Sequence, residues 1–170
     1  DMLDIPGLPA VRTGKAEIVS VEATPAQQAI MADFILRAEA IRTGRVKPEE
    51  DNMLKLTGEA RLMAIDPRLI RPDADGTGSK LSVCIEDVYQ VWKDPAASAS
   101  TQLVFCDVGT PKAGKFNVYD EIRNVLLAKG VPESEIAFVH DATSEAQRQE
   151  LFERTRQGKV RILIGSTSKL

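Results

Sequence analysis

The sequence predicts an α/β fold in which an open parallel sheet of three strands, joined by right-handed βαβ crossovers, follows a helical segment. From Thr101 onward, apolar runs alternate with amphipathic stretches of helical period. Near-continuous apolar runs are typical of parallel strands buried on both faces, and consecutive crossovers within one sheet are right-handed. The predicted strands are LVFCDV, IAFVHD and VRILIGS, and the predicted helices between them are FNVYDEIRNVLLAKG and TSEAQRQELFERTRQGK.

The chain divides into three parts by composition and pattern. Residues 1–15 are rich in proline and glycine and are predicted to be a linker. Residues 16–100 are predicted to hold one strand, AEIVSVEAT, and a helical approach segment, and residues 101–170 hold the α/β unit. The stretch DPAASASTQ is small and polar and is predicted to tether the second part to the third.

Capping and termination signals predict where the three helices of the approach segment begin or end. Thr24, Pro25 and Gln27 form a capping box with proline at the first helical position, and Gly44 ends that helix. A second helix is predicted over about residues 50–65, ending before an Asp-Pro step. Ser79 caps the third, KLSVCIEDVYQVWK. Apolar faces are predicted from Ile30, Phe34, Ala38 and Ile41 in the first helix, and from Leu81, Cys84, Ile85, Val88, Val91 and Trp92 in the third.

Composition excludes several classes of protein. The net charge is −3, from 22 basic and 25 acidic residues, whereas free-standing nucleic-acid-binding domains carry a marked basic excess. A small basic patch remains compatible with this balance. There is neither an apolar run of membrane-spanning length nor a signal-peptide pattern, which favours a cytoplasmic protein. Cys84 and Cys106 are expected to be buried thiols, and no metal-ligand spacing is present.

One candidate site follows the first predicted strand. The segment Gly109-Thr110-Pro111-Lys112-Ala113-Gly114-Lys115-Phe116 has the spacing of a phosphate-binding loop between a strand and a helix. Phe116 stands where the magnesium-binding hydroxyl belongs, and Pro111 removes one backbone N–H. An alternative function is therefore a small nucleotide-binding domain that uses Gly114, Lys115 and, as the acid, Asp141. The other interpretation of this segment is a solvated connecting loop.

The ordered set of motifs resembles a known family. The α/β unit is similar to the second RecA-like lobe of superfamily-two helicases and translocases, in particular the Swi/Snf-like group. The similar stretches are LVFCD, the helix after it, and IAFVHDATSEAQRQELFERTRQGKVRILIGSTSK. LVFCD stands at motif IV and ILIGSTSK at the start of motif V. Three stretches upstream are also similar to segments of this family: VEATPAQQAIM, MLKLTGEARLMAIDPRLI and SKLSVCIEDVYQVW. The resemblance therefore covers nearly all of the chain after about Ala16. The sequence further resembles large phage and plasmid helicase-like proteins that are often fused to an adenine-specific DNA methylase.

The resemblance implies a function and a set of site residues. In the family, lobe one binds ATP and magnesium, while lobe two closes over them and grips a nucleic-acid strand by its backbone. Carried over, Asp107 belongs to motif IV, whereas Ser166, Thr167, Ser168 and Lys169 begin motif V at the cleft. Arg148 matches the arginine of a Glu-Arg-Gln-like helix, although a structural role suits it equally. The implied partners are nucleic acid, with DNA favoured, lobe one and a methylase domain of the parent protein.

The departures from the family limit what this chain is expected to do. Asp141 and Ala142 replace the glycine of the family turn, and the glycine-rich remainder of motif V, motif VI and lobe one are missing. We therefore expect a fragment truncated inside motif V, without bound cofactor and without ATPase activity of its own. Truncation is also expected to leave VRILIGS at or near an exposed sheet edge, where it favours association.

Two further interpretations remain open. One is a non-enzymatic α/β interaction module, such as a receiver-like domain, which would use Asp107 and Asp141 with Lys169. A receiver site requires paired acids, and this sequence lacks them. His140 is the only histidine, and because the sequence names no partner for a general base, a structural or turn role is expected for it.

Overall fold

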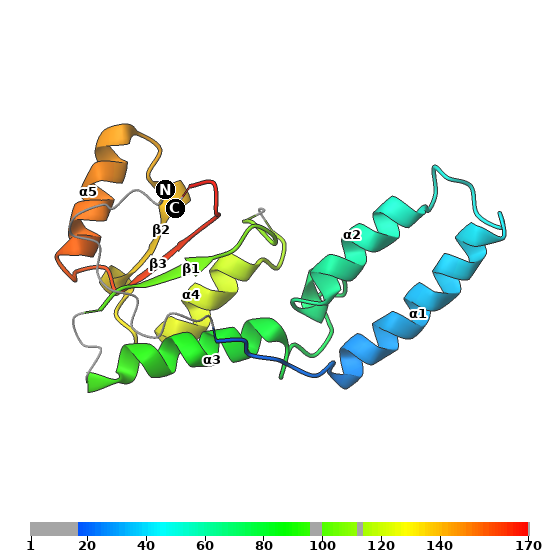
Figure 1. Cartoon of the computed structure of the whole chain (residues 1–170), viewed down its shortest axis with the longest axis horizontal. Helices are drawn as coiled ribbons and strands as arrows, with labels where there is room; N and C mark the ends of the chain where they lie inside the picture. Colours follow the sequence, from blue (N-terminus) through cyan, green and yellow to red (C-terminus); the bar gives the residue numbers. More distant parts are fainter. Residues whose placement is uncertain (1–16, 96–99, 112–113, 170) are drawn as a thin grey trace, which may run out of the picture.

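The computed structural model describes residues 17–95, 100–111 and 114–169. A layered α/β unit lies at one end of the molecule and a two-helix arm projects from the other (Figure 1). In chain order the elements are α1 (Pro25–Arg42), α2 (Met53–Met63), η1 (Pro67–Leu69), α3 (Lys80–Lys93), β1 (Gln102–Phe105), α4 (Val118–Ala128), η3 (Glu133–Glu135), β2 (Ile136–Phe138), η4 (Val139–Asp141), α5 (Glu145–Arg156) and β3 (Ile162–Gly165), where η denotes a 3-10 turn.

The predicted sheet is confirmed as open, three-stranded and parallel throughout its described part. Its spatial order is β1-β3-β2, and Ile162 of β3 lies opposite both Gln102 of β1 and Ile136 of β2. The β1-to-β2 connection moves two places across the sheet, and the β2-to-β3 connection moves one place back. Helix α4 packs on the face of Ile162 and Ile164, while α5 packs on the opposite face with Leu163. Because direction and face both reverse, the two crossovers share one hand.

The edge assignment made from the sequence is wrong. Strand β3, the VRILIGS run, is the central strand, and all four of its residues are buried. The edges are β2 and β1, and β1 buries only one face, because the side chains of Leu103 and Phe105 are exposed. Burial on both faces, which was expected for all three strands, therefore holds fully only for β3. The reason is topological: the returning chain enters the space between the first two strands.

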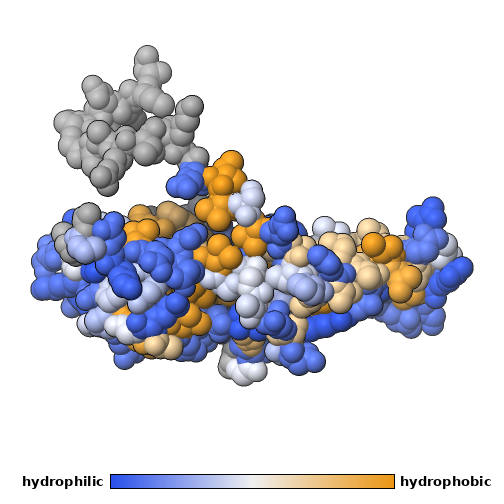
Figure 2. All heavy atoms as spheres, turned by 90° about the horizontal axis from the view of Figure 1, so that it is seen from below, coloured by the Kyte–Doolittle hydropathy of each residue, from blue (hydrophilic) through white to orange (hydrophobic). Residues whose placement is uncertain are grey.

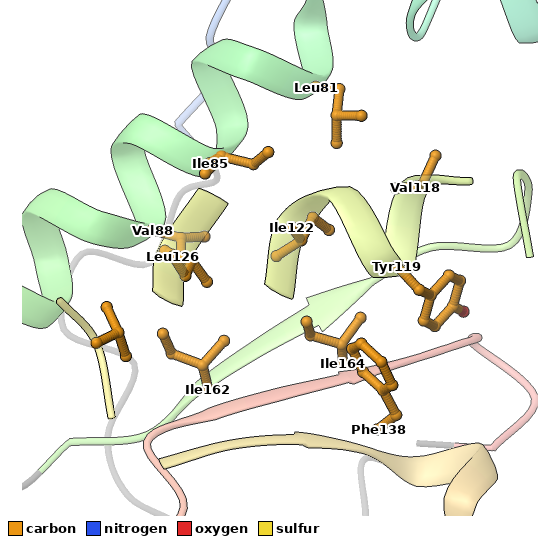
Figure 3. Close-up of a cluster of buried hydrophobic side chains, with 11 residues drawn as sticks. Leu81, Ile85, Val88, Val118, Tyr119, Ile122, Leu126, Phe138, Ile162 and Ile164 are labelled. Carbon is orange, nitrogen blue, oxygen red and sulfur yellow. The ribbon is translucent and has the colours of Figure 1, made fainter. Parts of the chain in front are cut away.

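The main core lies between the sheet and two layers of helix. In Figure 3, side chains from α3 point toward α4, and side chains from α4 point toward the sheet. Tyr119, Ile122 and Leu126 form the buried face of α4. The cluster consists of Leu81, Ile85, Val88, Val118, Tyr119, Ile122, Leu126, Val131, Phe138, Ile162 and Ile164. Helix α3 thus packs mainly on α4, and the Gln102 side chain of β1 joins it to the sheet directly by donating to the carbonyl of Val88 at 2.9 Å.

The arm has a small core of its own. Ile30 and Phe34 of α1 pack against Leu56 and Met63 of α2, with Ala38 and Ile41 beside them. The predicted capping box is confirmed, since Thr24 Oγ1 accepts from Gln27 N at 3.2 Å and Gln27 Oε1 accepts from Thr24 N at 2.9 Å. Buried Gln27 also donates to the carbonyl of Met63 at 2.9 Å, which joins the start of α1 to the end of α2.

Three local predictions need correction. The described residues 17–24 form no strand, because no other described segment pairs with them, and Ile18 is 85% exposed. Helix α2 begins at Met53, later than residue 50, since the Asn52 side chain accepts from Lys55 N and caps it there. Cys84 is exposed and Cys106 only partly buried, and both are free thiols. The predicted linker, residues 1–15, and residues 96–99 of the tether lie outside the described residues.

Apolar side chains also stay exposed on the arm and on the segment that leads into it. They are Ile18, Val19, Met31, Ile35, Leu36, Met53 and Leu54. Figure 2 shows patches of hydrophobic colour in the middle of the molecule and along the arm. This surface adjoins a largely apolar hollow of about 430 Å³ beside the start of α1.

A buried carboxylate joins the arm to the α/β unit. Asp66 is fully buried, and its oxygens accept from Ser79 Oγ at 2.8 Å and from Arg68 N and Nε, each at 2.9 Å. Arg68 also donates to Glu121 Oε1 on α4 at 2.7 Å, and its guanidinium lies over the Phe116 ring. These carboxylates, Asp66 foremost, raise the pKa of Arg68. The network therefore fixes η1, the start of α3 and the start of α4 together.

We predict that Asp66→Asn, which keeps the size but removes the charge, lowers the free energy of unfolding by about 3 kcal/mol, because Arg68 is left without its principal counter-charge. Asp73→Asn makes the same change at an exposed site and is expected to be near neutral. Urea unfolding followed by circular dichroism measures both. Equal stability of the two variants would contradict the prediction.

Candidate functional site

The carboxyl ends of the three parallel strands meet at one edge of the sheet. Asp107 follows β1, His140 follows β2 within η4, and Ser166 follows β3 directly. In open α/β sheets, ligands bind outside this edge. The strand order matters for the site, because it makes the segments after β1 and β3 direct neighbours.

Two of the residues predicted for the cleft contact each other. The Asp107 carboxylate accepts from Thr167 N and from Thr167 Oγ1, each at 2.7 Å. Hydrogen bonds from the Thr167 hydroxyl and backbone N–H hold the pKa of Asp107 below its ordinary range. The bidentate contact joins the segment after β1 to the segment after β3 across 60 residues of sequence.

The turn after β3 is further ordered by local contacts. Lys169 N donates to the carbonyl of Ser166 at 2.9 Å, and the hydroxyls of Ser166 and Ser168 lie 3.0 Å apart. Beneath this turn, the Tyr119 hydroxyl donates to the carbonyl of Cys106 at 2.6 Å. Burial raises the pKa of Tyr119, which keeps its hydroxyl protonated as a donor. Tyr119 thus anchors the chain immediately before Asp107 to the main core.

A cavity of about 250 Å³ opens at this edge. Its described lining residues are Thr110, Pro111, Tyr119, His140, Gly165, Ser166 and Lys169. Among them are a lysine, a histidine and three hydroxyls, and no carboxylate. For a chain of net charge −3, this is a local concentration of hydrogen-bond donors and positive charge. The lining suits a small anion such as a phosphate group.

The structure brings together five of the residues predicted for the cleft. Asp107 and residues 166–169 all lie at the carboxyl edge, and Ser166 and Lys169 line the cavity itself. Arg148 does not line it. It lies on α5, where its side chain pairs with Glu145 at 3.5 Å.

The loop with phosphate-binding spacing is built differently from a nucleotide site. Helix α4 begins only at Val118, and the Asn117 side chain caps it by accepting from Asp120 N at 2.9 Å. The first turn then carries two acids, Asp120 and Glu121, which disfavour an anion there. Lys115 is exposed, and Lys112 lies outside the described residues.

Asp141 lies away from this loop. It lines a separate hollow of about 320 Å³ along the free edge of β2, together with Arg123, Glu150 and Arg154. It therefore shares no cavity lining with Thr110 and Pro111, and the acid cluster that a receiver-like site needs is not assembled. Within the described ranges, no group of three or more histidine, cysteine, aspartate or glutamate side chains is placed to hold a metal ion.

Sequence reasoning missed part of the cavity lining. The position of Tyr119 on the buried face of α4 explains its ring but gives no signal for the contact of its hydroxyl. For Thr110 and Pro111 the sequence predicts a nucleotide loop or a solvated connecting loop, and neither interpretation places them beside His140 and Lys169. The position of His140 at a strand end was the one available signal for a place at the carboxyl edge.

No protein-family model, no curated protein and no solved structure matches this chain. Among the described helices, none combines the length and the apolar character that crossing a membrane requires.

We predict that Thr167→Ala raises the pKa of Asp107 toward its ordinary value of about 3.9, because one of its two hydrogen bonds is lost. Carbon-13 NMR titration of the aspartate carboxyls measures this. Thr77→Ala is the matched control, because Thr77 makes the same kind of contact with Asp75 and should shift only that residue.

The sign of the linked stability follows from the lowered pKa. Asp107 stabilises the fold above the ordinary pKa of an aspartate, and this contribution disappears as the pH falls through the lowered value in the folded protein. Thr167→Ala should therefore lose less stability than the parent chain between neutral and acid pH. An unchanged acid profile in thermal unfolding would contradict this.

Proposed function

We propose that this chain contributes part of the second lobe of an ATP-dependent nucleic-acid helicase or translocase, and that its carboxyl-edge cavity contacts the backbone of the nucleic acid. The observation that carries the proposal is the Asp107–Thr167 contact. It joins the segments that resemble motif IV and motif V beside a cavity lined by Lys169 and Ser166.

The chemistry of the cavity supports backbone contact. Lysine and hydroxyl side chains are common partners of phosphate oxygens, and such contacts position a protein on a strand without reading its sequence. The cavity presents these groups beside a turn that Asp107 holds in place.

The proposal places the remaining chemistry elsewhere in the parent protein. ATP and magnesium belong to lobe one in the family that the chain resembles. Phosphoryl transfer needs such a cation and positioned catalytic groups. DNA is the nucleic acid we favour, with lobe one and a DNA methylase domain as partners in the parent chain, acting in the cytoplasm.

We predict that the chain binds fluorescein-labelled single-stranded DNA and that Lys169→Ala weakens this binding about three- to tenfold, because one phosphate contact is lost. Fluorescence anisotropy at several salt concentrations measures affinity, and the salt slope should fall by about one contact in the variant. Lys159→Ala is the control, because Lys159 is exposed just before β3, away from the carboxyl edge. Equal weakening by both variants would indicate nonspecific charge attraction.

We also predict that the chain alone hydrolyses no ATP, with or without DNA, because the sequence carries no catalytic set for that reaction. A phosphate-release assay tests this, with Lys115→Ala as the companion variant. Hydrolysis stimulated by DNA, or magnesium-dependent ATP binding that Lys115→Ala abolishes, would overturn the proposal in favour of a nucleotide-binding domain.

A further inference from the structure

The imidazole of His140 is held rigidly at the wall of the carboxyl-edge cavity. Its ring stacks on Phe138 with centroids 5.2 Å apart and an interplanar angle of 14°, and it meets the Tyr119 ring edge-on at 5.1 Å. The side chain nevertheless keeps 30% of its surface exposed, and it lines the cavity. The aromatic contacts account for the orientation of the ring, and the Asp141 carboxylate lies near its Nε2.

The charged groups around His140 come from several elements. On its own turn, the Asp141 carboxylate lies 3.5 Å from Nε2. On α4, Tyr119 directs its hydroxyl to the Cys106 carbonyl. After β1, Asp107 is occupied by Thr167, and after β3, Lys169 lines the same cavity as His140. The cavity thus presents two nitrogen-bearing side chains and no lining carboxylate, while Asp141, which lines the neighbouring hollow, approaches the Nε2 of His140.

We infer that His140 is a phosphate-contacting residue that acts with Lys169, so that the cavity binds a phosphate group between them. The inference deepens the proposed function and rests on it for the source of the phosphate, which is the nucleic-acid backbone. The volume of about 250 Å³ accommodates a phosphate group, and Thr110 and Ser166 add hydroxyls to the lining. A rigid donor costs little entropy on binding, which gives the aromatic packing of His140 a role in recognition.

The test uses the fact that His140 is the only histidine of the chain, so its ring signals in proton NMR are unambiguous once any tag is removed. Inorganic pyrophosphate is added as the probe at constant pH. We expect a saturable shift of the His140 ring signals, with a Kd that rises at least threefold in Lys169→Ala and stays unchanged in Lys159→Ala. Ring signals that do not move, or a shift that is indifferent to Lys169→Ala, would overturn the inference.

A pair of variants separates recognition from packing. His140→Phe keeps an aromatic ring against Phe138 and Tyr119 but carries no donor, whereas His140→Gln keeps a donor and loses the ring. We expect His140→Phe to unfold near the parent temperature and to bind pyrophosphate about five- to tenfold more weakly, with His140→Gln intermediate in affinity. Calorimetry measures the affinity of both variants. Unimpaired binding by His140→Phe would show that the ring is merely structural.

The two proposals fail in different ways. If pyrophosphate shifts the His140 signals but no Lys169-dependent DNA binding is found, the cavity serves free phosphate or nucleotide, and the proposed function fails alone. If DNA binding depends on Lys169 while the His140 signals stay fixed under both DNA and pyrophosphate, the proposed function stands and the inference falls.

Discussion

The buried carboxylate of Asp66 is the interaction on which the arrangement of this molecule depends. A charge taken fully out of water is costly unless hydrogen bonds and a counter-charge replace its hydration. Asp66 meets this requirement through Ser79 and through the backbone and side chain of Arg68. Since Ser79 caps α3 and Arg68 also reaches Glu121 on α4, the same contacts position both helices that cover one face of the sheet.

The layers above that junction explain how the site is supported. Helix α3 packs on α4, and α4 packs on β3, whose residues are all buried. Tyr119 connects the main core to the site, because its ring belongs to the core and its hydroxyl donates to the Cys106 carbonyl just before Asp107. A site formed by loops at a sheet edge is thereby tied to the most rigid part of the fold, as effective recognition of a ligand requires.

Electrostatics at the carboxyl edge are local and do not follow from the net charge. The chain is acidic overall, yet lysine, histidine and hydroxyl groups line the cavity, while Asp107 is occupied by Thr167 and Asp141 faces another hollow. The exposed apolar face of β1 and the exposed side chains along α1 are a separate property of the surface, and nothing in the structure shows what covers them.

Local chemistry in the sequence determined much of this protein. The capping box at Thr24, the cap at Ser79, the helix end at Gly44 and the order of strands and helices after Thr101 were all predicted, because caps, turns and hydrophobic period act over a few residues. The cleft residues were predicted through the family resemblance. Their mutual contact was not, because Asp107 and Thr167 lie 60 residues apart and meet only when β3 enters beside β1. The same event made β3 central, whereas residues 17–24 have no strand structure because no segment in the described part of the chain pairs with them. The pairing of strands depends on contacts between residues far apart in the sequence, which local patterns do not specify. Only the tertiary structure therefore decided which strands form the sheet edges, which hollow Asp141 lines, and that His140 and Lys169 line one cavity.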